Sequence, residues 1–321
     1  MKISIIIPVK EINNYILESI PYLLNQSYGN FEIIIFPDKA NKKLRNKKIR
    51  IIETGEIGPA EKRDLALRYA KGEILAFIDD DAYPKKDWIE KGLINFKDKS
   101  VGAVGGPNLT PEKDNKFQKN SGFVLSSSFV SGSVGYRYKK AKRKEIDDFP
   151  SCNLFLRKNI FEEIGGFDSN YWPGEDTKLC LKIIKLGKKI IYDPKVIVYH
   201  HRRKDLKSYL KQIFSYSKHR GYFAKKFDKN SLKLAYFIPS LFLISLFVGP
   251  FLFLINKTIS LIYIFVLGIY LLLLILISFK GKIKGHGFFG VMKIIFLTHI
   301  IYGFGFILGL LKKNLERKLR K

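Results

Sequence analysis

Three consecutive aspartates, Asp79, Asp80 and Asp81, have the residue types and spacing best suited to chemistry in this sequence. They directly follow Ile74–Ile78, an apolar run with the composition of a buried β-strand. Side chains at the carboxyl end of a parallel strand lie in the crevice where α/β sheets bind ligands, and aspartates two positions apart can hold a hard divalent cation that bridges a diphosphate. The triplet therefore predicts a metal–nucleotide site, and an acidic turn is the alternative.

A second acidic pair, Glu175-Asp176, follows the segment Trp172-Pro-Gly and opens a segment with helical spacing. A carboxylate at this place lies beside the helix N-terminus and has limited freedom. The same position suits helix capping, which contributes about 1 kcal/mol. Chemistry and capping are compatible roles for Asp176.

Alternating apolar runs and amphipathic segments must position these acids. Continuous apolar runs rich in β-branched residues predict buried strands, and apolar residues at helical spacing predict helices. The predicted strands are Ile3–Val9, Phe31–Phe36, Ile74–Ile78, Val101–Val104, Cys152–Arg157, Lys189–Tyr192 and Val196–Tyr199, and the predicted helices are Tyr15–Asn25, Ala60–Ala70, Trp88–Phe96 and Asp176–Leu186. The alternation predicts an α/β fold with a mostly parallel sheet covered on both faces.

Composition limits the partners. The 321 residues carry a formal net charge of +28, which suits nucleic acid, an anionic membrane surface or a polyphosphate ligand. Abundant Lys, Ile, Asn, Phe and Tyr, as an AT-rich genome dictates, account for part of the excess. The basic residues are dispersed and accompany no recognition-helix, zinc-finger or RNA-binding signature. We therefore expect no nucleic-acid partner.

The cysteines and the N-terminus indicate a reducing compartment. Cys152 and Cys180 are the only cysteines and lack metal-ligand spacing, so neither a disulfide framework nor a structural metal is implied. The first apolar run is interrupted by Pro8 and is too short for the core of a signal peptide. We expect the N-terminal domain to stay in the cytoplasm.

Long apolar segments dominate the C-terminal part. Leu234–Ile255, Ile259–Phe279 and Phe288–Leu311 each approach the roughly 20 residues that cross a bilayer as a helix. The third contains Lys293, His299 and several glycines, so it is either a span or a broken, re-entrant element. Core helices of a second soluble domain are the alternative. We expect two or three transmembrane segments.

Basic residues that flank these segments give conflicting orientations. Lys and Arg favour the cytoplasmic side of membrane segments. The lysines at 280, 282 and 284 agree with a cytoplasmic N-terminal domain and two spans, whereas three spans place the basic tail 312–321 outside. Upstream, Leu206–Phe227 mixes Lys and Arg with apolar residues, as expected of a helix in the headgroup plane. A soluble amphipathic helix is the alternative.

Six motifs occur in the order seen in family 2 glycosyltransferases, which the sequence resembles over roughly residues 1–205. They are Ser4-Ile-Ile-Ile-Pro8, Phe31-Glu-Ile-Ile-Ile-Phe-Pro-Asp38, Gly58-Pro-Ala-Glu-Lys-Arg63, Ile78-Asp-Asp-Asp81, Gly165-Gly-Phe-Asp168 and Glu175-Asp176. The resemblance implies the family's GT-A nucleotide-sugar-binding fold and inverting transfer of a sugar.

The resemblance also implies a nucleotide-sugar-binding set. Pro8 ends the first strand at the nucleotide pocket, Asp38 resembles the aspartate that hydrogen-bonds the base, and Arg63 resembles the basic residue near the phosphates. Glu11 is a further candidate contact. The chain differs from the family at Val9-Lys10-Glu11, where an aromatic residue and Asn are commoner, so the identity of the base is not implied.

The remaining site residues follow from the same motifs. Asp79 would face the ribose and contribute to the metal, Asp81 would bind the metal, and Asp80 would support either. His200, at the end of a predicted strand, resembles a family histidine that completes the metal shell, and a structural role is its alternative. The expected cofactor is a divalent metal, Mg²⁺ or Mn²⁺.

In the family, the second acid of the Glu-Asp pair is the general base. The resemblance therefore makes Asp176 the candidate base and Glu175 its catalytic neighbour. Inverting transfer needs one carboxylate to take the acceptor's proton while the metal stabilises the departing diphosphate.

The polar stretch from Pro107 to Asp148 has no predicted fold. It is either an acceptor-binding lid or a surface insertion.

The function expected from these observations is transfer of a sugar from a nucleotide diphosphate sugar to a lipid-linked or glycan acceptor at the cytoplasmic membrane face. The predicted domains are residues 1–205 for catalysis, 206–230 for the interfacial helix and 231–321 for the membrane. A nucleotidyl- or phosphosugar-transferase is disfavoured because no Gly-rich activating loop follows the first strand. A non-catalytic membrane scaffold or export partner is the remaining alternative.

Overall fold

The computed structural model describes residues 1–40 and 44–316, so residues 317–321 of the basic tail lie outside it. The chain divides into two compact units. The sheet unit comprises Met1–Leu109 and Lys139–His201, together with Glu316. The helical unit comprises Thr110–Tyr138 and Arg202–Leu315.

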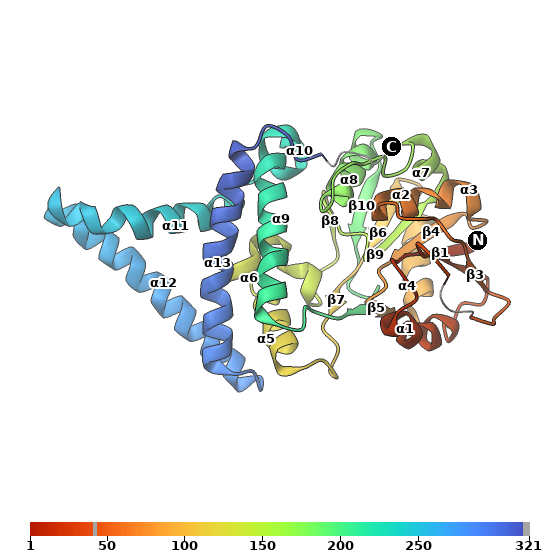
Figure 1. The fold of residues 1–321 in the computed structure, drawn as a ribbon, viewed down its shortest axis with the longest axis horizontal. Coiled ribbons are helices and arrows are strands. Elements are labelled where there is room, and N and C mark those ends of the chain that lie inside the picture. The colour runs from red at the N-terminus through yellow and green to blue at the C-terminus, as the bar shows by residue number, and fades with distance from the viewer. Residues whose placement is uncertain (41–43, 317–321) are drawn as a thin grey trace. The chain divides into compact units, whose positions relative to one another are not determined.

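A mostly parallel sheet organises the sheet unit (Figure 1). In the described residues its strand order is β3-β2-β1-β4-β9-β6-β10-β8. The strands are β1 (Ile3–Pro8), β2 (Phe31–Phe36), β3 (Ile49–Ile51), β4 (Ile74–Ile78), β6 (Val101–Gly105), β8 (Lys144–Ile146), β9 (Asn153–Arg157) and β10 (Lys189–Tyr192). β9 runs antiparallel to β4 and β6, and β8 runs antiparallel to β10. The predicted α/β class is confirmed.

Helices fill the connections of this unit and begin at recognisable signals. They are α1 (Asn14–Leu24), α2 (Pro59–Asp64), α3 (Ala66–Tyr69), α4 (Trp88–Ile94), η1 (Asn95–Lys97), α7 (Lys158–Glu163) and α8 (Glu175–Lys185). Asn13 caps α1 by accepting from the Tyr15 and Ile16 amides at 3.0 and 3.1 Å. The segment predicted as one helix over Ala60–Ala70 is divided at Leu65 into α2 and α3.

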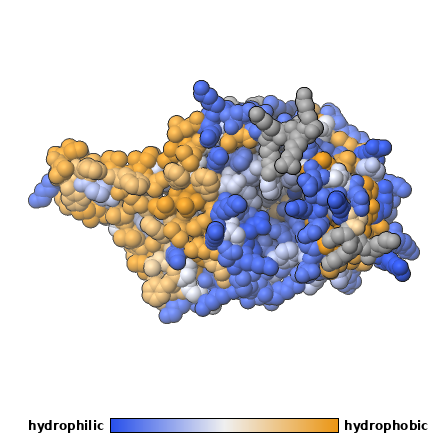
Figure 2. Space-filling model, in the orientation of Figure 1, coloured by the Kyte–Doolittle hydropathy of each residue, from blue (hydrophilic) through white to orange (hydrophobic). Residues whose placement is uncertain are grey.

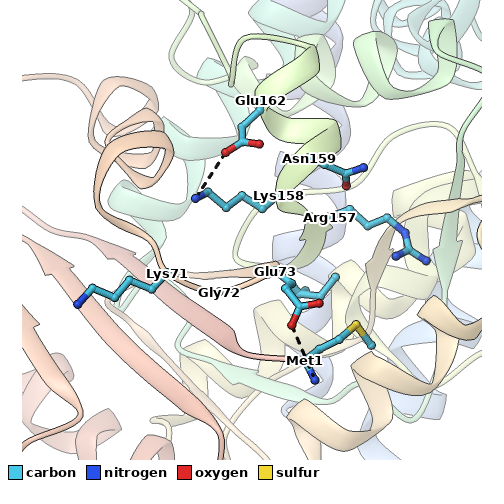
Figure 3. A pocket seen from close by; sticks show the side chains of 9 residues that line it. Met1, Lys71, Gly72, Glu73, Arg157, Lys158, Asn159 and Glu162 are labelled. Atoms are coloured by element: carbon cyan, nitrogen blue, oxygen red, sulfur yellow. Dashed lines mark ion pairs between the residues drawn. The ribbon is translucent and has the colours of Figure 1, made fainter.

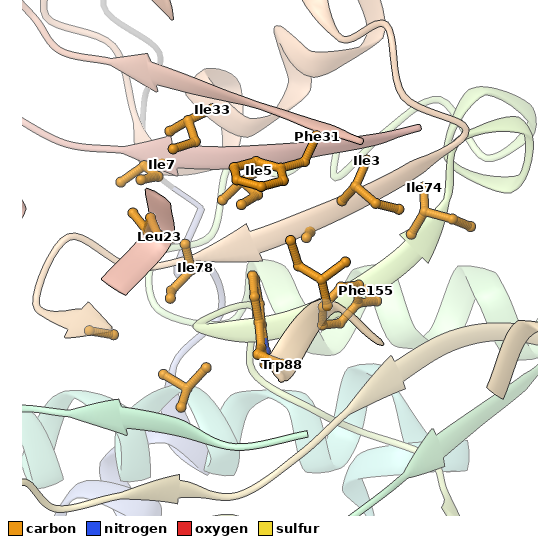
Figure 4. Close-up of a cluster of buried hydrophobic side chains, with 14 of the residues drawn as sticks. Ile3, Ile5, Ile7, Leu23, Phe31, Ile33, Ile74, Ile78, Trp88 and Phe155 are labelled. Carbon is orange, nitrogen blue, oxygen red and sulfur yellow. The ribbon is translucent and has the colours of Figure 1, made fainter. Parts of the chain in front are cut away.

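The core lies where β1, β2 and β4 meet the helices. Figure 4 shows Ile7 near Leu23 and Ile78, and Trp88 near Phe155, within one apolar cluster. Every residue of β1, β2 and β4 is buried. Complete burial explains why these strands are mostly apolar and do not alternate between apolar and polar residues. The exceptions, Ser4 and Glu32, are hydrogen-bonded to each other.

A buried amide fixes the middle of the sheet unit. The Asn153 side chain accepts from the Trp88 indole at 2.8 Å and donates to the carbonyl oxygens of Gly106 and Val196, each at 2.9 Å. A Cβ on Gly106 would lie 1.8 Å from the Val196 oxygen. Only glycine therefore allows the two backbone segments to approach the same amide.

A small second sheet, in the order β5-β11-β7, lies beyond the end of β4. It joins β5 (Ala82–Pro84), β11 (Val198–His200) and β7 (Asn108–Leu109). β11 pairs antiparallel with β5, which places His200 opposite Ala82. This pairing joins the chain after the Asp triplet to the strand that ends in the histidine pair.

The helical unit consists of segments from two parts of the chain. They are α5 (Lys116–Ser126), α6 (Ser128–Ser131), η2 (Gly132–Tyr138), α9 (Leu206–Lys226), α10 (Asp228–Ser231), η3 (Leu234–Tyr236), α11 (Ile238–Val248), η4 (Gly249–Leu254), α12 (Lys257–Ile283) and α13 (Phe288–Leu311). Among the described residues, α12 and α13 are long and apolar enough to cross a membrane, which indicates membrane association. α13 is continuous despite its glycines.

The apolar run Leu234–Ile255 contains one apolar helix, Ile238–Leu254, which is shorter than α12 and α13. The run is divided into η3, the shorter helix α11 and η4. Gly249-Pro250 explains the change from α11 to η4, because proline cannot donate the backbone hydrogen bond that continues an α-helix.

Part of the stretch with no predicted fold belongs to the helical unit. Val124 of α5 lies in one apolar cluster with Tyr209 and Ile213 of α9 and Val291 of α13. Residues 110–138, which the sequence analysis places in the first domain, therefore join the helical unit. Their periodicity is weak because α5 buries polar residues as well, including Gln118 and Asn120.

Replacing Gly106 by alanine should destabilise the sheet unit by about 1–3 kcal/mol, because the added methyl group overlaps the Val196 carbonyl oxygen. Thermal unfolding of the detergent-solubilised full chain, followed by tryptophan fluorescence, measures the loss. Gly29→Ala is the matched control, since nothing lies within 4 Å of its added Cβ. Equal melting temperatures for the two variants would contradict the packing account.

Candidate active site

Two aspartates of the triplet and one histidine converge at the carboxyl end of β4. His200 Nε2 lies 2.9 Å from Asp81 Oδ1. One ligand atom from each of Asp79, Asp81 and His200 lies within 4.8 Å of the others. The antiparallel pairing of β5 and β11 brings the histidine to the triplet, and the His201 amide donates to the Asp81 carbonyl at 3.0 Å.

The donor set fits a divalent cation. Carboxylate oxygens suit Mg²⁺ and Mn²⁺, and an imidazole nitrogen favours Mn²⁺ over Mg²⁺. All three side chains are partly exposed, so an ion and its ligand can reach them. Asp79, Asp81 and His200 therefore form a candidate metal centre.

A buried arginine joins this centre to the second acidic motif. The Arg63 guanidinium donates to Asp79 Oδ1 at 2.8 Å and to Glu175 Oε1 at 3.1 Å. Arg63 is 5% exposed, and burial alone would lower its pKa. The charges of Asp79, Glu175 and Asp176 outweigh burial and raise the pKa of Arg63, so the guanidinium stays charged.

Asp176 lies beside this bridge, in the first turn of α8. Burial, followed by the charge of Glu175, raises the pKa of the Asp176 carboxyl well above the usual range, while a hydrogen bond from Ser151 partly opposes the shift. Among the described residues, Asp176 Oδ1 and Glu175 Oε2 are buried without a hydrogen-bond partner. Buried oxygens of this kind are costly unless a ligand supplies the donor.

Asp38 and the end of β1 form another part of the same sheet edge. Asp38 follows β2 and pairs with the buried Lys62, whose ammonium group also donates to the Val9 carbonyl oxygen. Pro8 is buried at the end of β1. Glu11 is exposed in the loop between β1 and α1. Parallel strands β1, β2 and β4 thus direct their following residues to one edge.

Asp80, the middle residue of the triplet, is bound by Asn13. The Asn13 amide donates to Asp80 Oδ2 at 2.6 Å. Burial, followed by the charge of Asp81, raises the pKa of Asp80 to about 6. The middle aspartate therefore ties the triplet to the start of α1.

Sequence reasoning missed three residues that support the site: Asn13, Lys62 and Ser151. Asn13 had a signal, because asparagine directly before a helical pattern is an N-cap. Lys62 lies inside a recognised motif, but its burial is visible only in the fold. Ser151 contacts Asp176 across a sequence separation that no local pattern covers.

A separate hollow of about 450 Å³ lies at the opposite edge of the sheet. Figure 3 shows its polar lining, with ion pairs between Lys158 and Glu162 and between the Met1 amino group and Glu73. It adjoins Ile74, where β4 begins, whereas the Asp triplet follows the end of β4. The hollow is therefore not part of the candidate active site.

The fold and the acidic cluster define the class of protein: a GT-A-like sheet with acids at the carboxyl end of a central strand. Residues 4–165, about half of the chain, match the family described as Glycosyl transferase family 2. The chain belongs to this family, and it is a glycosyltransferase.

Relatives and a solved structure agree with the family. One relative is the dolichyl N-acetyl-α-D-glucosaminyl phosphate 3-β-D-2,3-diacetamido-2,3-dideoxy-β-D-glucuronosyltransferase of Methanococcus voltae, which is 26% identical to this chain. The alignment covers 97% of this chain and 98% of the relative. Another relative, the pre-mycofactocin glycosyltransferase of Mycobacterium tuberculosis, is 29% identical to this chain. That alignment covers 48% of this chain and 32% of the relative. The mannosyltransferase PcManGT of Pyrobaculum calidifontis, solved with GDP-Man and Mn²⁺, shares the fold with a TM-score of 0.56, at 17% identity over 97% of this chain and 87% of that chain.

Replacing Arg63 by methionine should destabilise the chain by about 3–5 kcal/mol, because Glu175 is left as a buried, unpaired carboxylate. Unfolding of the solubilised full chain measures the change. Lys85→Met removes the exposed ion pair with Asp87 and should cost under about 1 kcal/mol. Similar losses in the two variants would contradict a bridging role for Arg63.

Proposed function

We propose that the chain is an inverting glycosyltransferase that moves a sugar from a nucleotide diphosphate sugar to a lipid-linked acceptor at the cytoplasmic face of a membrane. The observation that carries the proposal is the half-buried Asp176, whose buried Oδ1 lacks a hydrogen-bond partner within the described residues. It adjoins the Glu175–Arg63–Asp79 bridge, so the candidate base and the candidate metal centre belong to one site.

Asp176 takes the proton of the acceptor hydroxyl in this proposal. A buried carboxylate with a raised pKa is a stronger base than an exposed aspartate. The Ser151 hydroxyl and the helix α8 hold its orientation. Glu175 is a positioning residue, because its carboxylate receives the Arg63 guanidinium.

Asp79, Asp81 and His200 would hold the divalent metal. When bound, Mg²⁺ or Mn²⁺ supplies positive charge that stabilises the departing diphosphate. Arg63 adds a permanent positive charge beside Asp79. Mn²⁺ in the PcManGT complex supports this assignment.

The nucleotide would lie along the carboxyl ends of β1, β2 and β4. Asp38, which is paired with Lys62, would accept a hydrogen bond from the base. Asp79 would face the ribose. Pro8, Glu11, Arg63 and Asp80 complete the proposed nucleotide-sugar set. Their common sheet edge is the crevice that α/β sheets use for ligands.

A lipid-linked acceptor is favoured over a soluble glycan. The Methanococcus voltae relative is named for a dolichyl N-acetylglucosaminyl phosphate substrate and aligns with almost the whole chain. Apolar helices keep an enzyme near a lipid substrate. The lysines at 280, 282 and 284 directly follow the apolar part of α12 and favour the cytoplasmic side, so we place the catalytic unit there.

Asp176→Asn should lower turnover by about 10²–10⁴-fold, since the amide cannot accept the proton. The loss of turnover is measured as the release of nucleoside diphosphate by membranes that contain the enzyme, across a panel of donors and lipid-linked acceptors. Glu163→Gln, an exposed acid on α7, is the control and should keep full activity.

The pH profile separates a base from a structural acid. Because the pKa of Asp176 is raised, kcat/KM of the parent enzyme should fall as pH decreases through a value well above the aspartate norm of about 3.9. Intact turnover in Asp176→Asn, or an acidic limb near pH 4, would sink the assignment.

Chelation should abolish transfer, and Mn²⁺ or Mg²⁺ should restore it. Asp81→Asn and His200→Ala should each require more metal for half-maximal activity, because each removes one donor of the centre. His219→Ala, on α9, is the histidine control and should keep the parent's metal requirement. Full activity after exhaustive chelation would rule out the metal centre.

A further inference from the structure

Two helices of the helical unit, α9 and α13, pack closely side by side. α9 and α13 run parallel, with the Tyr209 and Thr298 hydroxyls 2.9 Å apart near one end. Further along, a Cβ on Gly305 would lie 2.1 Å from Ser217 Oγ, and one on Gly309 would lie 2.0 Å from the Lys218 carbonyl oxygen. The helices approach too closely for lipid to separate them. If α13 crossed a membrane, α9 would have to cross beside it.

α9 carries a row of lysines along one face. Lys207, Lys211, Lys218 and Lys225 recur at spacings of four, seven and seven residues, which fall on one side of a helix with 3.6 residues per turn. Three of them are exposed, and Lys218 is half-buried. The row extends about 27 Å, nearly the thickness of a bilayer's hydrocarbon core. A crossing α13 would therefore carry charged side chains into hydrocarbon.

The apolar surface of α13 fits a position at the membrane surface. Its exposed side chains Phe289, Phe296, Phe304 and Leu311 form one stripe along the helix. Lys293 is exposed on the same stripe. A lysine there can extend its charge to the headgroups when the helix lies flat, while the aromatic rings enter the hydrocarbon.

α11, η4 and α12 have a different surface. In the most apolar 18-residue stretch of each helix, 11% is buried in α12 and 44% in α13. Figure 1 shows α11 and α12 meeting at their far ends, away from α13, and Figure 2 shows the surface there as hydrophobic up to a hydrophilic tip. The turn at that tip contains Asn256 and Lys257. α12 has 27 residues, enough to cross, and Ile238–Leu254, with 17, reaches the lower limit of a crossing helix.

We propose that the helical unit crosses the bilayer with α11–η4 and α12 alone, and that the α9–α13 pair lies in the headgroup region of one leaflet. The hydrocarbon core surrounds the α11–α12 hairpin, and Lys257 emerges on the opposite side. The lysines at 280, 282 and 284 and those at 312 and 313 then lie on one side. This arrangement removes the conflict between the positive-inside rule and three spans.

Single cysteines at three exposed positions test the arrangement: Lys257→Cys, Lys284→Cys and Lys313→Cys. The full chain is labelled with a membrane-impermeant maleimide in sealed right-side-out and inside-out vesicles. The parent chain, whose Cys152 and Cys180 are buried, gives the background. Positions 284 and 313 should be labelled from the same side, and position 257 from the other.

Each other labelling pattern overturns the proposal. Labelling of 284 and 313 from opposite sides means that α13 crosses. Labelling of 257 and 284 from one side means that the hairpin does not cross. Spin labels at Phe289→Cys and Phe304→Cys give an independent depth measurement: the proposal predicts equal depths, whereas an upright crossing helix separates them by about 22 Å.

Discussion

The buried Arg63 guanidinium is the interaction on which the site depends. Asp79 and Glu175 belong to motifs almost a hundred residues apart in the sequence. In the fold both carboxylates contact the same guanidinium, and without this cation their negative charges would repel each other. Arg63 binds both and is itself buried. Breaking such a pair costs several kcal/mol, so the fold holds the metal ligands and the acid pair together before any substrate binds. Preorganisation of this kind favours catalysis, since less ordering is needed at the reaction step.

A second constraint comes from the membrane. A lysine at the centre of a bilayer costs about 2.5–3.5 kcal/mol by insertion scales. α9 carries several along one face and is packed against α13 without space for lipid. Hydropathy alone treats α13 as a span, whereas its neighbour determines which depth it can occupy. The same lysines that conflict with a crossing suit an anionic headgroup layer.

Most strands of the sheet could be predicted from the sequence, because β1, β2 and β4 are mostly apolar runs of the kind found in strands buried on both faces. The acids of the site were also visible as motifs. Their neighbours were not: the Arg63 bridge and the Lys62–Asp38 pair depend on burial and long-range packing. The approach of His200 to Asp81 depends on the pairing of β11, which the predicted strand Val196–Tyr199 overlaps, with β5, whose three residues are too few to predict from periodicity. Helix α5 was missed because it buries polar side chains.

The central claim is that acids far apart in the chain meet around one metal-bound diphosphate. Locating Mn²⁺ by anomalous scattering in crystals of the full chain with a nucleoside diphosphate tests it most directly. The account predicts one peak bound by Asp79, Asp81 and His200, in contact with the diphosphate, with Asp176 facing the same cleft. A peak at other residues, or a diphosphate bound away from Asp176, would contradict it.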